Sequence, residues 1–238
     1  MGSACTIAAL QMRDNRHLFT ADHWEPNTKN FAHFFAAAIS LDSYNFKESL
    51  RGNKWDEEDL EAWIFLKQYY PFTDEYFSEL CAAKFDQDIN LRMGLRGMFT
   101  RDYKNYLMGN SECAGKLGMS VTNISVDRLF NHFGKEALCT AIEDFMNVRD
   151  LSMFGICCDV HGEDGSNQRF ILLYTSKKDS FARSFDKLCG QIDTSEVVKA
   201  SNCVMGEFAD ASYAAWSINN LSLSRKKFEA FLKTIYTN

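Results

Sequence analysis

The 238-residue chain is poor in the features that assign a protein to a special class at once. It holds two prolines and thirteen glycines, which excludes a collagen-like or proline-rich protein. No apolar run reaches the ~18 residues that a membrane span needs, and the first residues lack the basic character of a secretory signal. We therefore expect a cytoplasmic protein that does not enter a membrane.

Several catalytic and metal-binding motifs are also missing. The sequence contains no Walker loop, no GxGxxG, no GxSxG and no HExxH, and none of its eight cysteines forms a CxxC pair. Cys157 and Cys158 are adjacent in an apolar stretch, so on a strand they would point to opposite faces and could not share one metal ion. We interpret the cysteines as reduced residues, mostly of the core.

The composition is that of a globular protein with a substantial core. Hydrophobic residues make up 46% of the chain and charged residues 24%. The 26 basic and 32 acidic residues give a net charge of −6, which argues against general nucleic-acid binding. A local basic site for a phosphate compound remains compatible with this charge.

The chain reads as an α/β protein in two parts, with expected domains over residues 1–90 and 91–238. Helical patterns fill the first part, with N-cap residues at Ser3 and Thr73. We expect these helices at 3–13, 31–42, 56–70, after 73, and at 86–97. The second part alternates, with strands at 98–108, 116–125, 151–160 and 169–175, a helix at 126–149 and a basic helix at 224–236.

Asp42 is the first candidate for chemistry, because it follows the apolar run AAISL directly. A carboxylate in apolar surroundings needs a partner, and a hard cation would satisfy it. The alternative is that Asp42 caps the next turn, since aspartate is a favoured cap residue.

Asp102 and Lys104 form the second candidate. Two residues apart on a strand, they would project to the same face, where the carboxylate could hold the ammonium toward an anion. The alternative is an ordinary solvated face of the strand.

Ser224, Arg225, Lys226 and Lys227 form the third candidate, at the expected start of the last helix. Three cations and a hydroxyl beside the free N–H groups of a helix terminus would suit a phosphate. The alternative is a solvated basic helix face.

Taken in order, several stretches make the chain resemble the C-terminal part of the DHH phosphoesterase superfamily, in the branch of yeast-type exopolyphosphatases, prune proteins and family II pyrophosphatases. These stretches are GSACT (2–6), AAISLDSYNF (37–46), MFTRDYKNYLMGN (98–110), KLGMSVTNIS (116–125), FGICCDV (154–160) and LSRKKF (223–228). The resemblance implies the helical end of a DHH domain, followed by a DHH-associated substrate-binding domain with a mixed sheet.

The same resemblance implies roles for the candidate residues. Asp42 matches a metal ligand of the family, for Mg²⁺ or Mn²⁺, whereas Lys104, Arg225 and Lys226 match residues that bind substrate and neutralise its charge during hydrolysis. Ser224 and Lys227 would add to the substrate site. The substrate would be polyphosphate, pyrophosphate or a similar phosphate compound.

The sequence departs from the family in its metal ligands. It contains no DHH tripeptide, and no D-x-D pair precedes Asp42. We therefore expect an N-terminal DHH segment to be missing, either because the chain is a fragment or because the catalytic half was lost. The function expected is metal-dependent phosphoanhydride hydrolysis in the complete enzyme, with this chain inactive alone. The alternative is a non-enzymatic module that binds phosphate compounds or partners.

Overall fold

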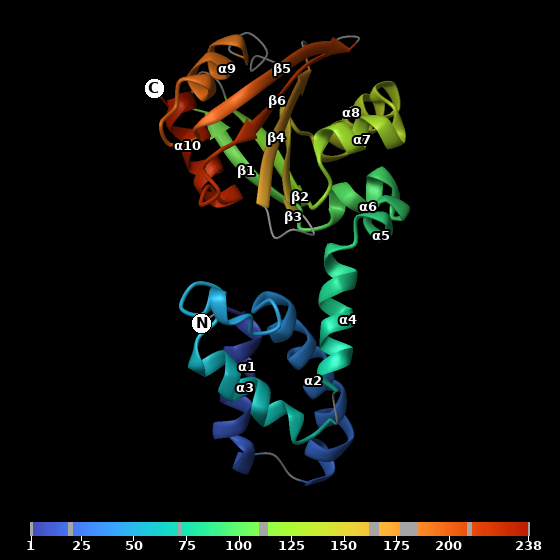
Figure 1. Cartoon of the computed structure of the whole chain (residues 1–238), viewed down its shortest axis with the longest axis vertical. Coiled ribbons are helices and arrows are strands. Elements are labelled where there is room, and N and C mark those ends of the chain that lie inside the picture. The colour runs from blue at the N-terminus through green and yellow to red at the C-terminus, as the bar shows by residue number, and fades with distance from the viewer. Residues whose placement is uncertain are drawn as a thin grey trace. The chain divides into compact units, whose positions relative to one another are not determined.

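The computed structural model describes residues 2–18, 21–70, 73–109, 114–161, 167–176, 185–208 and 211–237, with the backbone alone at 21–27, 114, 161 and 236–237. The expected turn after Gly109, most of the Gly-rich turn that follows residue 160, and Cys113 lie outside these residues. The chain divides into two compact units, Met1–Asp86 and Gln87–Asn238, which we describe separately (Figure 1). This division lies four residues before the end of the first expected domain.

The first unit is helical. Its helices are α1 (Ala4–Asp14), α2 (Ala21–Asp42), α3 (Glu57–Lys67) and α4 (Asp74–Phe85), with short 3₁₀ turns at Arg16–Leu18 and Glu48–Leu50. The expected caps are confirmed, because the side chain of Ser3 accepts from Cys5 N and that of Thr73 accepts from Tyr76 N. Alanines on three helices let the helices pack closely around a core of Ala9, Ala32, Ala36, Ile39, Ala62, Phe65, Leu66 and Phe77.

The second unit is mixed α/β, as expected for the class of the chain. Its helices are α5 (Gln87–Arg92), α6 (Gly94–Thr100), α7 (Val126–Phe133), α8 (Lys135–Arg149), α9 (Phe185–Asp193) and α10 (Arg225–Thr237). Its strands are β1 (Lys104–Gly109), β2 (Ala114–Thr122), β3 (Met153–His161), β4 (Asn167–Ser176), β5 (Ala200–Phe208) and β6 (Ala211–Ile218). They form one sheet in the order β1-β2-β3-β4-β6-β5, in which β2 and β3 are parallel and the other neighbours antiparallel.

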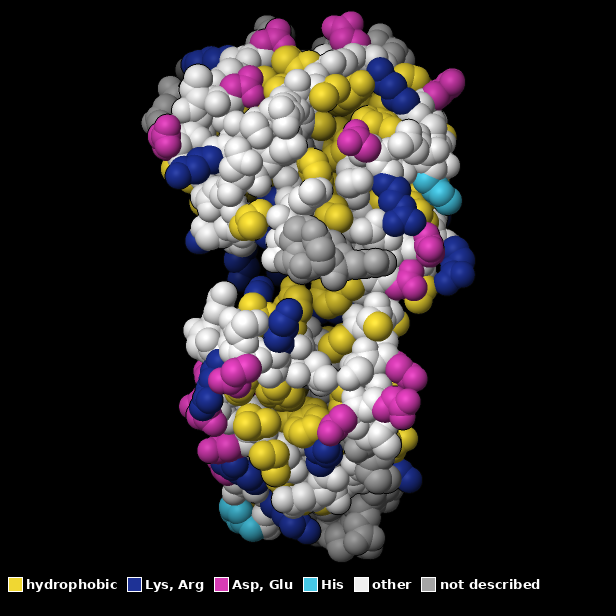
Figure 2. Space-filling model, in the orientation of Figure 1, with side chains coloured by type: hydrophobic (Ala, Val, Ile, Leu, Met, Phe, Trp, Pro, Cys, Tyr) yellow, Lys and Arg dark blue, Asp and Glu magenta, His cyan; other side chains and the backbone are white. Residues whose placement is uncertain are grey.

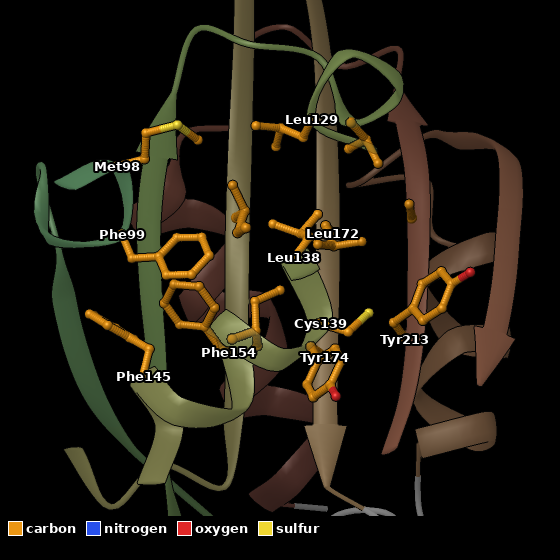
Figure 3. Packing of buried hydrophobic residues seen from close by; sticks show 14 of the residues in the cluster. Met98, Phe99, Leu129, Leu138, Cys139, Phe145, Phe154, Leu172, Tyr174 and Tyr213 are labelled. Atoms are coloured by element: carbon orange, nitrogen blue, oxygen red, sulfur yellow. The ribbon is translucent and has the colours of Figure 1, made fainter. Parts of the chain in front are cut away.

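Helices cover both faces of this sheet (Figure 1). We call the side packed by α5–α8 the α8 face, and the side packed by α9 and α10 the α10 face. Cys158 lies in the core of the α8 face and Cys157 in that of the α10 face, which confirms the expected alternation. Figure 3 shows the core of the α8 face, where Phe99, Phe145 and Phe154 meet as a group of three rings.

Three expected elements differ in the structure. Residues 98–100 belong to α6 rather than to a strand, since the adjacent Met98 and Phe99 are both buried in one core and the Thr100 hydroxyl donates to Arg96 O. The segment 86–97 is divided between α5 and α6 at Gly94, where φ is +69°. The helix expected over 126–149 is broken at Gly134, whose φ of +80° ends α7 and begins α8.

The surface carries charge of both signs. Figure 2 shows acidic and basic side chains interspersed over the face in view. A polyanion would therefore find its site in a local group of cations rather than in a uniformly basic surface.

Within the part of the chain that the structure covers, no helix combines the length and apolar character that crossing a membrane requires.

Candidate anion-binding site

Asp42 is the last residue of α2 and is exposed. It does not cap the next turn, because Ser43 has that role: the Ser43 hydroxyl accepts from Phe46 N at 3.4 Å and donates to Ser40 O at 3.1 Å. The turn itself has three left-handed residues in a row, Tyr44–Phe46, with φ between 53° and 57°.

The residues around Asp42 do not form a metal centre. Among the side chains that the structure describes, no group of three His, Cys, Asp or Glu residues could hold a metal ion. Mg²⁺ and Mn²⁺ take several oxygen ligands, which one exposed carboxylate does not provide. The described residues therefore do not fit the expected Mg²⁺ or Mn²⁺ centre.

The position of Asp42 predicts a small gain in stability for Asp42→Asn. The carboxylate lies at the negative end of the dipole of a 22-residue helix, where an anion is unfavourable. We expect the free energy of unfolding to rise slightly at low salt, and the gain to disappear at high salt as charge is screened. Urea denaturation of both proteins at two salt concentrations measures this. A loss of stability at low salt would contradict the interpretation.

The second and third candidates meet in the structure, although 123 residues separate Asp102 from Arg225. The guanidinium of Arg225, the first residue of α10, donates to the backbone carbonyl of Asp102 through Nη1. Its Nη2 donates to Asp102 Oδ1 at 3.1 Å. Asp102 therefore holds Arg225. The expectation that Asp102 stands on the strand with Lys104 is wrong, because Asp102 lies in a turn before β1 with φ +48°.

Arg225 is the most enclosed of the expected site residues. Its side chain is only 10% exposed, and its Nε–H is buried without a hydrogen-bond acceptor among the described residues. A buried donor without an acceptor costs about 1–3 kcal/mol.

Lys104 lies at the start of β1, on the side of the sheet that α10 covers. Two and four residues further along the strand, Tyr106 and Met108 pack into the core of the α10 face. Side chains of a strand alternate between faces, so Lys104 shares this face with them. Figure 1 shows α10 beside β1, and the two elements are in contact. Lys104 itself is exposed, so its ammonium is accessible to a ligand.

The first turn of α10 supplies the remaining candidates. The Ser224 hydroxyl accepts from Lys227 N at 3.4 Å and so caps the helix, which leaves its own proton available to donate. The side chains of Lys226 and Lys227 are exposed. Their charges lie at the positive end of the helix dipole, where an anion is favoured.

A second ion pair, which the sequence did not reveal, lies on the same face of the sheet. Arg169 of β4 is directly opposite Asp159 of β3, and its Nε donates to Asp159 Oδ1. Burial raises the pKa of the Cys157 thiol to about 12. Asp159 adds to this rise, whereas Arg169 and Arg225 oppose it. Charges of both ion pairs therefore act on one thiol.

A hairpin register could have predicted this pair. Residues 159 and 169 are equidistant from residue 164, the centre of the Gly-rich turn, so an antiparallel hairpin centred there places them opposite each other. Opposite charges in such a pair attract.

The arrangement can neutralise an anion in two ways. The two carboxylates balance the two guanidinium groups, so the charges of Lys104, Lys226 and Lys227 are left over. The first backbone N–H groups of α10 add uncharged donors.

No protein-family model matches this sequence, and no curated protein matches it either.

Proposed function

We propose that this chain binds the terminal phosphate of pyrophosphate, polyphosphate or a similar compound, at a site formed by Lys104, Ser224, Arg225, Lys226 and Lys227. The observation that carries the proposal is that the start of α10, where Asp102 holds Arg225 beside the exposed Lys226, contacts the strand that carries the exposed Lys104. A phosphate oxygen is an acceptor of the required charge.

The charge balance supports the same ligand class. A terminal phosphate carries about two negative charges, which the three exposed lysines can neutralise. Arg225 is pre-oriented by Asp102, so little side-chain freedom is lost when it binds. Asp102 also lowers the positive charge of the site. The site therefore suits a small anion better than a nucleic acid, which needs a long, uniformly basic surface.

We further propose that the site serves metal-dependent hydrolysis of phosphoanhydride bonds, as in the exopolyphosphatases and pyrophosphatases of the DHH superfamily that the sequence resembles. The cations of this chain would bind and orient the terminal phosphate and neutralise its oxygens as charge builds up. Mg²⁺ or Mn²⁺ would supply an activated water for this reaction, and its ligands would come from outside the described residues. Such a protein would work in the cytoplasm.

The lack of a described metal centre favours a second candidate function, a non-enzymatic module that binds phosphate compounds. One assay tests whether this chain holds a catalytic centre of its own. The purified chain, given Mn²⁺ or Mg²⁺ and pyrophosphate, is expected to bind the anion without turnover. Turnover near the ordinary enzyme rate of ~10 per second would show that the chain holds a complete catalytic centre.

Calorimetry with pyrophosphate at low salt tests the anion site. Lys104→Ala and Lys226→Ala each remove an exposed cation, so folding should be unaffected while affinity falls by roughly ten- to hundredfold, the value of one charged hydrogen bond. Lys187→Ala is the matched control, because Lys187 is an exposed lysine of α9 in the same unit.

The same control tests the alternative that these residues form only a solvated basic face. If Lys187→Ala weakened binding as much as Lys104→Ala and Lys226→Ala, the affinity would come from overall charge and the basic start of α10 would be a solvated face. If the unaltered protein bound no pyrophosphate, the proposed function would be wrong.

A further inference from the structure

Arg169 joins the sheet to the segment that leads into α10. From β4, its Nη1 donates to the backbone carbonyl of Leu221 at 2.8 Å and also to that of Leu223. Its Nε is bound to the carboxylate of Asp159 on β3. The guanidinium of Arg169 therefore links β4 and β3 to the chain immediately before Ser224.

The same segment is held by further hydrogen bonds. Asn220 Nδ2 donates to Val197 O at 2.7 Å, and Leu223 N donates to Asn220 O at 3.0 Å. The Leu223 side chain is buried in the core of the α10 face. The backbone that enters α10 is thus fixed by several hydrogen bonds, and Arg169 links it to β3 and β4.

We infer that Arg169, held by Asp159, is a positioning residue for the anion site: it fixes the first turn of α10 over the sheet so that Arg225 and Lys226 meet the same ligand as Lys104. This inference rests on the proposed function for its ligand. Arg169 is 17% exposed and three of its hydrogen bonds are to the protein, so it acts through the backbone rather than by touching the anion.

The chemistry of arginine explains the choice of residue. A planar guanidinium can donate to a carboxylate and to two carbonyls at once in a fixed geometry, whereas an ammonium is a point charge on a flexible stem. Arg169→Lys would therefore keep the charge and lose the geometry.

Positioning and simple electrostatics predict opposite effects of Asp159→Ala on the affinity for pyrophosphate. If only charge mattered, Asp159→Ala would remove a negative charge near the site and strengthen pyrophosphate binding. If Asp159 holds Arg169 in place, the same change weakens binding, and we expect a loss of about tenfold, equivalent to one misplaced charged hydrogen bond. Arg169→Lys should weaken binding similarly, although the charge is retained.

The experiment is calorimetry with pyrophosphate on the full chain, with Asp186→Ala as the matched control. Asp186 is an exposed acid of α9, so its removal changes the net charge equally without touching the segment before α10. Tighter or unchanged binding by Asp159→Ala, or full affinity in Arg169→Lys, would overturn the positioning role while leaving the proposed function intact.

Hydrogen exchange without ligand provides the second readout. Amides of the first turns of α10 should exchange faster in Asp159→Ala and Arg169→Lys than in the unaltered protein, while those of α8 on the opposite face remain unchanged. If the unaltered chain bound no pyrophosphate, the proposed function would fail and this exchange measurement would decide the positioning role alone. Unchanged exchange in α10 would then contradict it.

Discussion

Replacement of Asp59 by alanine is expected to destabilise the helical unit by roughly 3 kcal/mol or more, because it leaves several buried donors without an acceptor. The Asp59 side chain is fully buried at the junction of α1 and α3. Its Oδ2 accepts from Gly2 N at 2.7 Å and from Asp56 N at 3.1 Å. Its Oδ1 accepts from Thr6 Oγ1 at 2.5 Å and from Ser3 N at 3.4 Å.

This carboxylate also explains the segment Gly2–Thr6. A Cβ atom on Gly2 would lie 1.8 Å from Lys54 O, so only glycine fits where the chain approaches the turn before α3. Urea denaturation followed by helical circular dichroism measures the effect, with the exposed neighbour Glu58→Ala as control. A loss in Asp59→Ala no larger than in Glu58→Ala would show that the bonds to Asp59 contribute little.

The second large effect is expected for Phe154→Ala in the α/β unit. Phe154 of β3 is fully buried, with its ring centroid 5.2 Å from that of Phe99 and 5.1 Å from that of Phe145 (Figure 3). Its truncation removes ring contacts and leaves a cavity between β3, α6 and α8, at a cost of about 3–5 kcal/mol.

Leu107→Ala is the matched control for this change, since Leu107 is an apolar strand residue that is 76% exposed, and we expect its effect to stay within about 0.5 kcal/mol. Hydrogen exchange of the sheet amides measures the loss of stability in the α/β unit. Equal exchange in the β3 amides of both variants would contradict the role of the three-ring group.

Local sequence signals predicted local structure well. Ser3 and Thr73 were identifiable as caps because a cap depends on residues within one turn, and the opposite faces of Cys157 and Cys158 follow from the geometry of any strand. The helix at residues 98–100 was missed because aromatic residues interleaved with charge suit strands as well as helices, and only burial against β2 and α8 decides between them.

Long-range partners could not be predicted in the same way. Asp59 stands in a run of acids that suits an exposed helix start, and nothing nearby in the chain reveals that the backbone of Gly2 and Ser3 will enclose it. Asp102 was paired with its neighbour Lys104 because no local pattern points 123 residues ahead to Arg225. The expectation that Lys104 and the basic start of α10 form one site came from the family resemblance.

The contact between Asp102 and Arg225 has a consequence for the order in which the protein matures. Asp102 precedes β1, whereas Arg225 follows the last strand of the sheet, so almost the whole α/β unit must leave the ribosome before the two can meet. Closing so long a loop is also the slow, entropically costly part of folding. Nascent chains of this protein would therefore form the proposed anion site last, and binding of a phosphate compound there would show that synthesis of the unit is complete.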